Sequence, residues 1–411
     1  MLTDRSRSAD PAADGDASRA RPPTPQPGYW AVAFAFLAVA VVLFAVVGLS
    51  VAHLPRHKNL TINSFTGRPW LAGWVQWDAG WFNRIATEGY FYDWRVPSSV
   101  AFFPGYPAAM RVTGLFIGNN MLAGILVTLG MGAASVLMFT RWVRERLSPA
   151  AAWTAVLLLI LYPFSFFLVG AIYVEALFVA SILAAFLLLE KGHPILAGLA
   201  GMVTTATRHV GIAIVIGLVW RQLEIRGAFA GKEGPRWRRW VPDLRKLQPG
   251  DYGVLLSCLG TIGFCLYLWH HWDNPLLFIE AQKSWGVDEG PRTWYKAHFF
   301  TEIQDFRSPF AWLVYMSHPV MTVVACCFLP RVFRRFGRAY GLFTFFAIFL
   351  PAFTLPNFFG MGRYLIPAFP WYAAAGEWLA ERQGLRRVVL AGSGLLLIVL
   401  TSFFSRGVYV S

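Results

Sequence analysis

The run WAVAFAFLAVAVVLFAVVGLSV, from Trp30 to Val51, decides the fold, and it contains no charged side chain. A transmembrane helix needs about 20 consecutive apolar residues, so this run predicts a helix that crosses a bilayer. The run is too long for the core of a signal peptide and lacks a small-residue cleavage site, so we expect it to be retained. Similar runs recur along the chain and predict an all-α membrane protein.

The composition agrees with this prediction. Of the 411 residues, 56% are hydrophobic and only 14% are charged, and the mean hydropathy is +0.49. Soluble domains carry about 25% charged residues, whereas a spanning β-barrel would show short alternating segments. The cysteines lie in apolar runs without metal-ligand spacing, which disfavours a disulfide framework. They are Cys258, Cys265, Cys326 and Cys327.

The formal net charge of +14 comes from arginine clusters between apolar runs. Cytoplasmic loops collect such clusters, so we interpret the charge as membrane topology and not as nucleic-acid binding. An N-terminus inside and a C-terminus outside place these clusters in the cytoplasm and give about eleven transmembrane segments. After the first, the expected spans are 121–140, 151–169, 171–189, a broken pair within 195–220, 252–269, 310–330, 340–355, 362–379 and 387–404.

The broken pair follows from the basic loop at 221–250. One continuous span over 195–220 would put that loop on the wrong side of the membrane, contrary to the positive-inside bias. Two half-length helices broken near TATRHVG keep both ends in the cytoplasm. Broken helices are tolerated at membrane depth where they line a cavity, so the sequence predicts a cavity beside this break.

The polar and apolar segments of the sequence also predict the domain organisation. Residues 1–28 are polar and contain five prolines, which predicts a disordered cytoplasmic tail. Residues 29–405 form one transmembrane domain without internal repeats. Its long outer loops are 53–118 and 271–308, and residues 106–118 are expected to form a helix at the membrane interface.

The first outer loop holds WDAGWFNRIATEGY, Trp77 to Tyr90, followed by AFFPGYP at 101–107. Asp78 lies between aromatic residues and is our first candidate for a residue that carries chemistry. Alternatively, Asp78 caps the helix that begins at AGWFNRIA, since Asp is a favoured N-cap residue. The aromatic residues alternatively form an interfacial belt, and Glu88 and Asp93 are expected to be solvated.

Ionisable residues near the outer ends of spans are the remaining candidates, because such positions are costly unless paired or functional. Glu175 alternatively forms a structural bridge with Arg208, and Arg363 alternatively snorkels to lipid headgroups. No P-loop, GxGxxG after a strand, HExxH or DxD-like pair occurs. We therefore expect no cofactor and no metal requirement.

Several segments resemble the PIG-V family of membrane mannosyltransferases, in the GT-C superfamily. The first loop is the most specific, with Trp-Asp after the first span, then Ile-Ala-x-x-Gly-Tyr and Ala-Phe-Phe-Pro-x-x-Pro. YVEALF, ATRHVG and GRYLIPAFP resemble later family segments, with Val174, His209 and Val210 as departures. The resemblance covers about residues 30 to 405.

This resemblance implies a GT-C-like bundle that transfers mannose, with inversion, from polyprenyl-phosphate mannose to a glycolipid or glycan acceptor. It implies that Asp78 is the base, and we place the active site on the outer face of a bacterial plasma membrane. A positioned carboxylate takes the acceptor proton, and arginine suits the departing phosphate. The donor-phosphate candidates are Arg208, Arg363, His209, Lys283 and Arg292. The candidates for the substrate cavity are Trp77, Trp81, Glu175, Tyr90, Phe103, Trp285 and Tyr364.

Two other classes of function stay open. A transporter or flippase of lipid-linked saccharides would use the same arginines to hold a phosphate, although such proteins often show internal repeats. A non-catalytic partner subunit of a mannosyltransferase complex is the third interpretation. Product formation distinguishes the enzyme from both.

Overall fold

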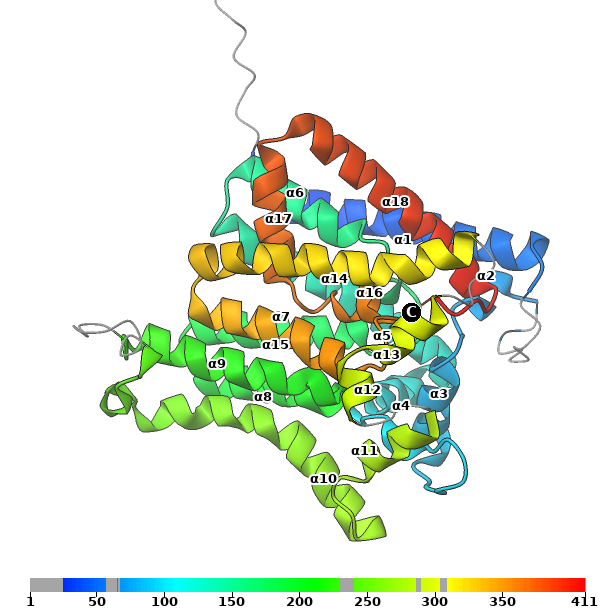
Figure 1. Cartoon of the computed structure of the whole chain (residues 1–411), viewed down its shortest axis with the longest axis horizontal. Helices are drawn as coiled ribbons and strands as arrows, with labels where there is room; N and C mark the ends of the chain where they lie inside the picture. Colours follow the sequence, from blue (N-terminus) through cyan, green and yellow to red (C-terminus); the bar gives the residue numbers. More distant parts are fainter. Residues whose placement is uncertain are drawn as a thin grey trace, which may run out of the picture.

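A computed structural model describes residues 25–56, 65, 67–229, 240–285, 290–303 and 309–410 (Figure 1). Most of the predicted cytoplasmic tail, residues 1–24, lies outside these ranges. Every regular element in the described ranges is a helix. The α-helices are α1 (Tyr29–His53), α2 (Pro69–Ala72), α3 (Ala79–Glu88), α4 (Gly105–Ile117), α5 (Asn120–Arg144), α6 (Pro149–Ile160), α7 (Glu175–Glu190), α8 (Pro194–Thr207), α9 (Ile212–Ile225), α10 (Leu259–Trp272), α11 (Leu277–Ala281), α12 (Pro291–Trp294), α13 (Ala297–Glu302), α14 (Pro309–Phe336), α15 (Arg338–Thr354), α16 (Met361–Tyr364), α17 (Pro370–Ala380) and α18 (Gln383–Ser405).

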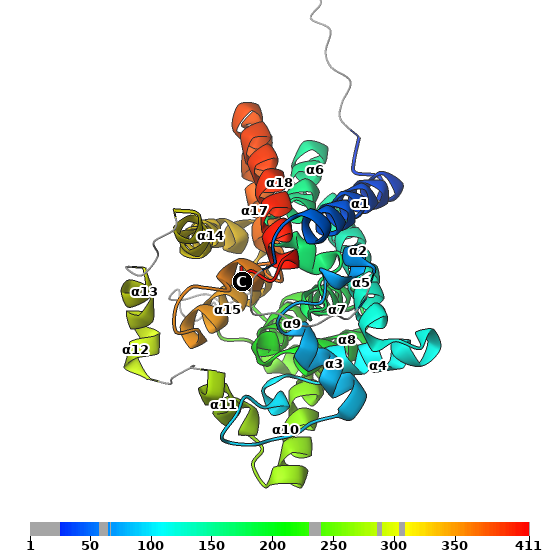
Figure 2. The same ribbon diagram turned by 90° about the vertical axis from the view of Figure 1, so that its right-hand side faces the viewer.

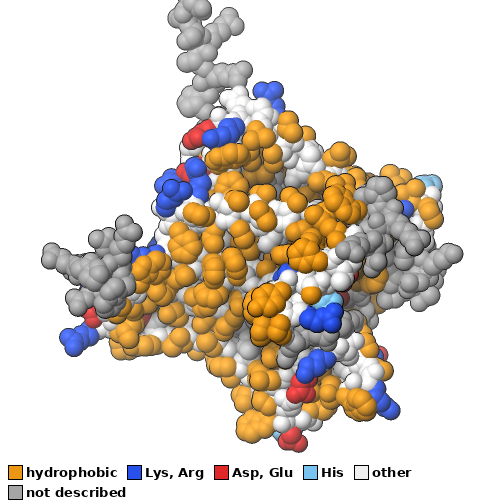
Figure 3. All heavy atoms as spheres, in the orientation of Figure 1, with side chains coloured by type: hydrophobic (Ala, Val, Ile, Leu, Met, Phe, Trp, Pro, Cys, Tyr) orange, Lys and Arg blue, Asp and Glu red, His pale blue; other side chains and the backbone are white. Residues whose placement is uncertain are grey.

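The predicted all-α polytopic membrane fold is confirmed. Five helices of the described chain are long and apolar enough to cross a membrane: α1, α5, the continuous helix Pro249–Trp272, residues Ala311–Phe336 of α14, and α18. Shorter apolar helices, among them α6, α8 and α15, lie between them. Figure 3 shows hydrophobic side chains spread over the face formed by α14, α15 and α9. The total of about eleven spans stays a prediction.

The predicted break within residues 195–220 is confirmed. Helix α8 ends at Thr207, a 3₁₀ turn (η3, His209–Gly211) follows, and α9 begins at Ile212. Arg208 joins the two helices in an extended conformation, with φ −164° and ψ 143°. The break therefore holds Arg208 and His209 outside regular α-helix.

Two predicted spans are wrong in their extent, and proline explains both. The span expected at 362–379 is divided into α16 and α17, separated at Pro367. The span expected at 151–169 ends at Ile160, shortly before Pro163, and continues as a 3₁₀ turn (η2, Ser165–Leu168). Proline lacks a backbone donor and disfavours helix in the residue before it.

Helix α7 lies at the centre of the bundle, where it packs against α5, α8 and α9. Its first residue is Glu175 and its last is Glu190. Helices α8, α9, α14 and α15 run in similar directions across the molecule (Figure 1). The short helices α3, α4, α11, α12 and α13 gather at one end of the bundle around the C-terminus (Figure 2). That end holds the candidate site.

Candidate functional site

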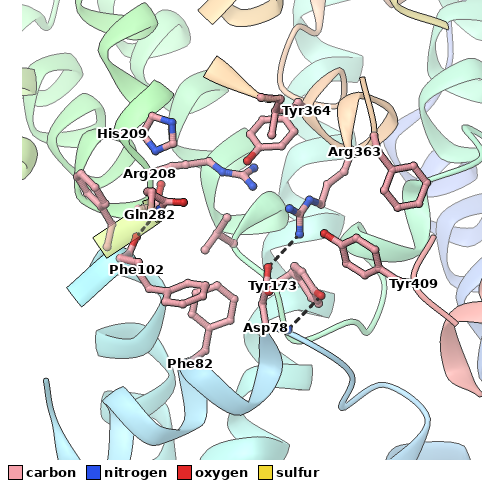
Figure 4. Close-up of a pocket in the computed structure, with 17 residues that line it drawn as sticks. Asp78, Phe82, Phe102, Tyr173, Arg208, His209, Gln282, Arg363, Tyr364 and Tyr409 are labelled. Atoms are coloured by element: carbon pink, nitrogen blue, oxygen red, sulfur yellow. Dashed lines mark hydrogen bonds and ion pairs between the residues drawn. The ribbon is translucent and has the colours of Figure 1, made fainter. Parts of the chain in front are cut away.

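A cavity of about 250 Å³ opens at this end of the bundle. Its walls come from segments far apart in the sequence: the start of α3, the turn before α7, the α8–α9 break, the α15–α16 connection and the C-terminal segment. Figure 4 shows their side chains converging on one space. The lining residues are Asp78, Phe82, Ala101, Phe102, Phe103, Tyr173, Val174, Thr207, Arg208, His209, Gln282, Leu355, Phe359, Gly360, Arg363, Tyr364 and Tyr409.

Asp78 occupies the N-cap position of α3, but its carboxylate makes no capping hydrogen bond. Instead, its backbone N–H donates to the Tyr173 hydroxyl at 3.2 Å. The carboxylate accepts from Arg363 Nη1 at 3.2 Å, and the side chain keeps 27% of its exposure. The capping alternative is therefore wrong for the side chain, and the carboxylate is directed toward the cavity (Figure 4).

The backbone that delivers Asp78 is unusual. Trp77 has a positive φ of 51°, a backbone angle that residues other than glycine seldom adopt. Its ring packs edge-on against Tyr409, with centroids 4.8 Å apart. The adjacent Gln76 donates its side-chain N–H to Ser405 O at 3.1 Å and so ties this turn to the end of α18. Packing thus holds a strained turn immediately before the candidate base.

Glu175 is fully buried and joins two arginines. Its Oε1 accepts from Arg208 Nη1 at 2.8 Å and lies 3.4 Å from Arg363 Nε. Glu175 begins α7, where the helix dipole favours a negative charge. The predicted Glu175–Arg208 bridge is confirmed, but the sequence did not indicate that Arg363 shares it.

Arg363 does not snorkel, because its side chain is only 7% exposed and lies between Asp78 and Glu175. Two arginines and two carboxylates thus form one cluster in which the formal charges cancel. Within the described chain, Arg363 Nε and Glu175 Oε2 are buried without a hydrogen-bond partner. Such atoms are uncommon in folded proteins and indicate a functional or strained position.

Helix α16 positions Arg363 through the residue before it. The Gly362 N–H donates to His318 Nδ1 at 3.0 Å, and the Gly362 carbonyl accepts from the Tyr162 hydroxyl at 2.8 Å. A Cβ at this position would overlap the Phe164 ring. Glycine is therefore required by close packing, and the backbone of α16 is held from two sides.

The structure brings several predicted residues to the cavity. Phe103, His209 and Tyr364 line it, together with Asp78, Arg208 and Arg363. The Arg208 guanidinium lies over the Tyr364 ring, 4.0 Å from its centroid, a favourable cation–π geometry. Trp81 stacks on Phe102 at a centroid distance of 5.8 Å and so supports the wall from behind.

Four predicted residues lie elsewhere or cannot be placed. Tyr90 faces a second cavity and donates its hydroxyl to Phe102 O at 2.9 Å. Lys283 lines a third cavity beside Asp93. Arg292 lies exposed on α12. The side chain of Trp285 falls outside the described residues.

The two other acids of the first loop are paired at the surface. Glu88 lies 3.1 Å from Arg84, with both side chains well exposed. Asp93 accepts from Arg95, and this hydrogen bond lowers the pKa of Asp93 to about 2. Both acids lie away from the cavity lining, as expected for solvated loop residues.

Sequence reasoning missed four polar lining residues: Tyr173, Thr207, Gln282 and Tyr409. Tyr173 stands two residues before Glu175, and Gln282 directly precedes the predicted Lys283. Tyr409 lies in the C-terminal segment, which the topology had placed outside. Their positions beside predicted elements were the available signals, but nothing local indicated that they meet.

Chemically, the cavity presents one accessible carboxylate beside two guanidiniums. A carboxylate of this kind accepts a proton from a hydroxyl group. Guanidiniums bind phosphate oxygens through parallel N–H donors and stabilise developing negative charge. The arrangement therefore suits a reaction in which a hydroxyl attacks and a phosphate leaves.

No protein-family model matches the chain, and no curated protein matches it in sequence. Among solved structures, it is similar to ArnT from Cupriavidus metallidurans bound to undecaprenyl phosphate, with 16% identity and a TM-score of 0.49 over 88% of this chain and 64% of that one. It is also similar to the oligosaccharyltransferase of Archaeoglobus fulgidus in complex with Zn and sulfate, with 14% identity and a TM-score of 0.48 over 91% and 53%.

A further structure of that oligosaccharyltransferase, AglB, in complex with an inhibitory peptide and a dolichol-phosphate, has 13% identity and a TM-score of 0.41 over 91% of this chain and 55% of that one. The chain thus spans between half and two thirds of the length of these structures. Because all three TM-scores are below 0.5, we draw no argument about the site from them.

Proposed function

We propose that the protein is a membrane glycosyltransferase that moves mannose from polyprenyl-phosphate mannose to a hydroxyl of a lipid-linked or glycolipid acceptor. Asp78 is the general base, and the anomeric carbon inverts. The observation that carries this proposal is the cavity in which the Asp78 carboxylate lies beside the guanidiniums of Arg208 and Arg363. The PIG-V-like first loop supports mannose as the sugar and the outer membrane face as the location.

The roles follow from charge. The acceptor oxygen attacks the anomeric carbon while its proton passes to Asp78. The bond from that carbon to the phosphate oxygen breaks, and the phosphate departs with an extra negative charge. No second acid is needed, unlike the carboxylate pair of a glycoside hydrolase. Arg208 and Arg363, whose side chains are only 11% and 7% exposed, stabilise this charge.

The neighbouring second cavity supports a lipid-linked donor. It measures about 490 Å³ and lies between α3, α4 and α10. Its lining is mainly apolar, with residues such as Ile85, Pro107 and Phe264, and the chain at Phe102–Pro104 separates it from the first cavity. Burial of hydrocarbon in such a groove contributes about 0.8 kcal/mol per CH₂. A polyprenyl chain fits this chemistry.

The test is transfer of labelled mannose by purified protein in lipid, with extracted membrane glycolipids as acceptors. We expect a labelled glycolipid from wild-type protein and none from Asp78→Asn. Asp93→Asn is the matched control, because Asp93 is also an ion-paired acid of the first loop but lies away from the cavity lining. Full activity of Asp78→Asn would refute the base assignment, and donor binding without any product would favour the transport alternative.

A further inference from the structure

We propose that Arg363 is a counter-ion shared between the base and the donor. In the free protein it holds the Asp78 carboxylate, and the arriving phosphate draws its N–H groups away. Asp78 therefore becomes free to accept a proton only after the donor has bound, so the donor binds first. This inference rests on the proposed function, because it requires a phosphate in the cavity.

The first observation is the engagement of Asp78 in the free protein. Its carboxylate accepts from Arg363 Nη1 at 3.2 Å, and within the described chain no second side chain bonds to it. The Arg363 N–H therefore occupies Asp78 Oδ2, an oxygen that could otherwise accept a hydrogen bond from an acceptor hydroxyl. An acceptor hydroxyl must compete with Arg363 for this oxygen in the free protein.

The second observation is that Arg363 can change partners without leaving the site. Its Nε lies 3.4 Å from Glu175 Oε1. Glu175 is fully buried and is not among the residues that line the cavity. A guanidinium has five N–H donors, yet within the described chain Arg363 gives one hydrogen bond to a side chain, that to Asp78. Glu175 thus anchors the guanidinium while its outer N–H groups exchange Asp78 for a phosphate.

The third observation is the position of Arg208. It shares Glu175 Oε1 with Arg363, and its guanidinium also faces the cavity (Figure 4). A phosphate between the two guanidiniums would contact both, whereas Asp78 contacts Arg363 alone. A bidentate phosphate contact is stronger than a single N–H to a carboxylate. The geometry therefore favours exchange once a phosphate enters.

The charges explain why the exchange suits the reaction. The four residues are neutral together, so a bound phosphodiester adds one uncompensated negative charge. During transfer the acceptor proton moves to Asp78, which loses its charge, and the electron pair of the broken bond leaves with the phosphate, which gains one. The total charge stays constant, and Arg363 lies between the group that loses negative charge and the group that gains it.

The experiment measures binding of a short-chain polyprenyl phosphate, without sugar, to purified protein in lipid nanodiscs. If Asp78 competes for Arg363, Asp78→Asn binds this probe about three- to tenfold more tightly than wild type. The gain disappears when Arg363→Gln is combined with it. Asp93→Asn controls for the removal of an outer-loop charge and leaves binding unchanged. Asp78→Ser repeats the test if the Asn variant unfolds in nanodiscs.

The outcomes separate this inference from the proposed function. Equal binding by wild type and Asp78→Asn overturns the shared counter-ion. A gain that persists in the Arg363→Gln background also overturns it, because the gain then reflects charge repulsion through space. If wild-type protein fails to bind the probe at all, the proposed function fails, and this inference fails with it.

Discussion

Helix α7 begins with Glu175 and ends with Glu190, and each glutamate binds arginines. The arginines at the two termini differ in their other partners. Glu175, at the cavity, holds Arg208 and Arg363. Glu190, at the opposite end, accepts from Arg146, Arg221 and the Tyr340 hydroxyl. Each arginine at the Glu190 end also donates to another protein acceptor: Arg146 to Trp142 O, and Arg221 to Glu224.

At the Glu175 end, by contrast, Glu175 is the one protein acceptor of Arg208 within the described chain, and the cluster borders a cavity. The Glu175 carboxylate is fully buried, whereas that of Glu190 is 13% exposed. Similar glutamate–arginine clusters therefore have different roles at the two termini of α7. At the Glu190 end each arginine has a second protein acceptor, and the cluster fastens helices together. At the Glu175 end the two guanidiniums and the Asp78 carboxylate border a cavity, so the cluster can act on a substrate.

The largest expected effect tests this contrast with one substitution at each end. Arg208→Gln removes a cation that stabilises the departing phosphate, so kcat for mannose transfer should fall about 10²- to 10³-fold. Arg221→Gln, at the Glu190 end, should leave kcat per folded molecule unchanged. Both are measured in the labelled-mannose assay. Equal losses in the two variants would remove the distinction between the clusters.

The second effect concerns stability at the Glu175 end. Glu175→Gln leaves two buried guanidiniums without their common counter-charge, so the free energy of unfolding should fall by about 3–5 kcal/mol. Thermal unfolding in detergent micelles measures this change. A Glu175→Gln protein as stable as wild type would show that Asp78 alone balances both arginines.

A third effect tests whether the cavity end depends on the backbone of α16. Gly362→Ala places a methyl group against the Phe164 ring, so we expect a loss of about 1–3 kcal/mol of stability together with reduced transfer, because Arg363 moves. Gly130→Ala is the control, since a Cβ there meets open space within α5. Alanine at that helical position should stabilise the protein by about 0.5–1 kcal/mol.

The smallest effect is expected at the other end of α7. Glu190→Gln keeps an oxygen that accepts hydrogen bonds, and its arginines retain other acceptors. We expect a loss of about 1 kcal/mol of stability and unchanged transfer per folded molecule. The thermal scan and the mannose assay measure both quantities. A Glu190→Gln variant that folds normally but loses transfer would contradict a purely structural role.

The sequence predicted the helical scaffold because hydropathy is a local property. The run at Trp30–Val51 became α1, and the charge bias located the α8–α9 break. The two wrong extents arose where Pro163 and Pro367 interrupt apolar runs, since an apolar composition alone does not reveal where a helix stops. Local proline chemistry would have corrected both.

The site was predictable only in part. Asp78, Arg208 and Arg363 stood out because they are charged residues within or next to apolar runs, and the motif resemblance supported all three. Their mutual distances depend on helix packing, which no local pattern encodes. Lys283 and Arg292 were chosen for charge in an outer loop, but side-chain direction in a loop depends on contacts with other segments. Tyr409 was missed because it contacts Trp77, which lies far from it in the sequence.

The buried Glu175 has a consequence for biogenesis. Its partner Arg208 follows 33 residues later in the chain, but Arg363 follows Asp78 only after 285 residues. At about 5–20 residues per second, the ribosome needs roughly 15 to 60 seconds to span that interval. An unpaired charge in the membrane is costly. The charge cluster is therefore incomplete until Arg363 has been synthesised, and the cavity end of the bundle can reach its final packing only once the late helices have formed.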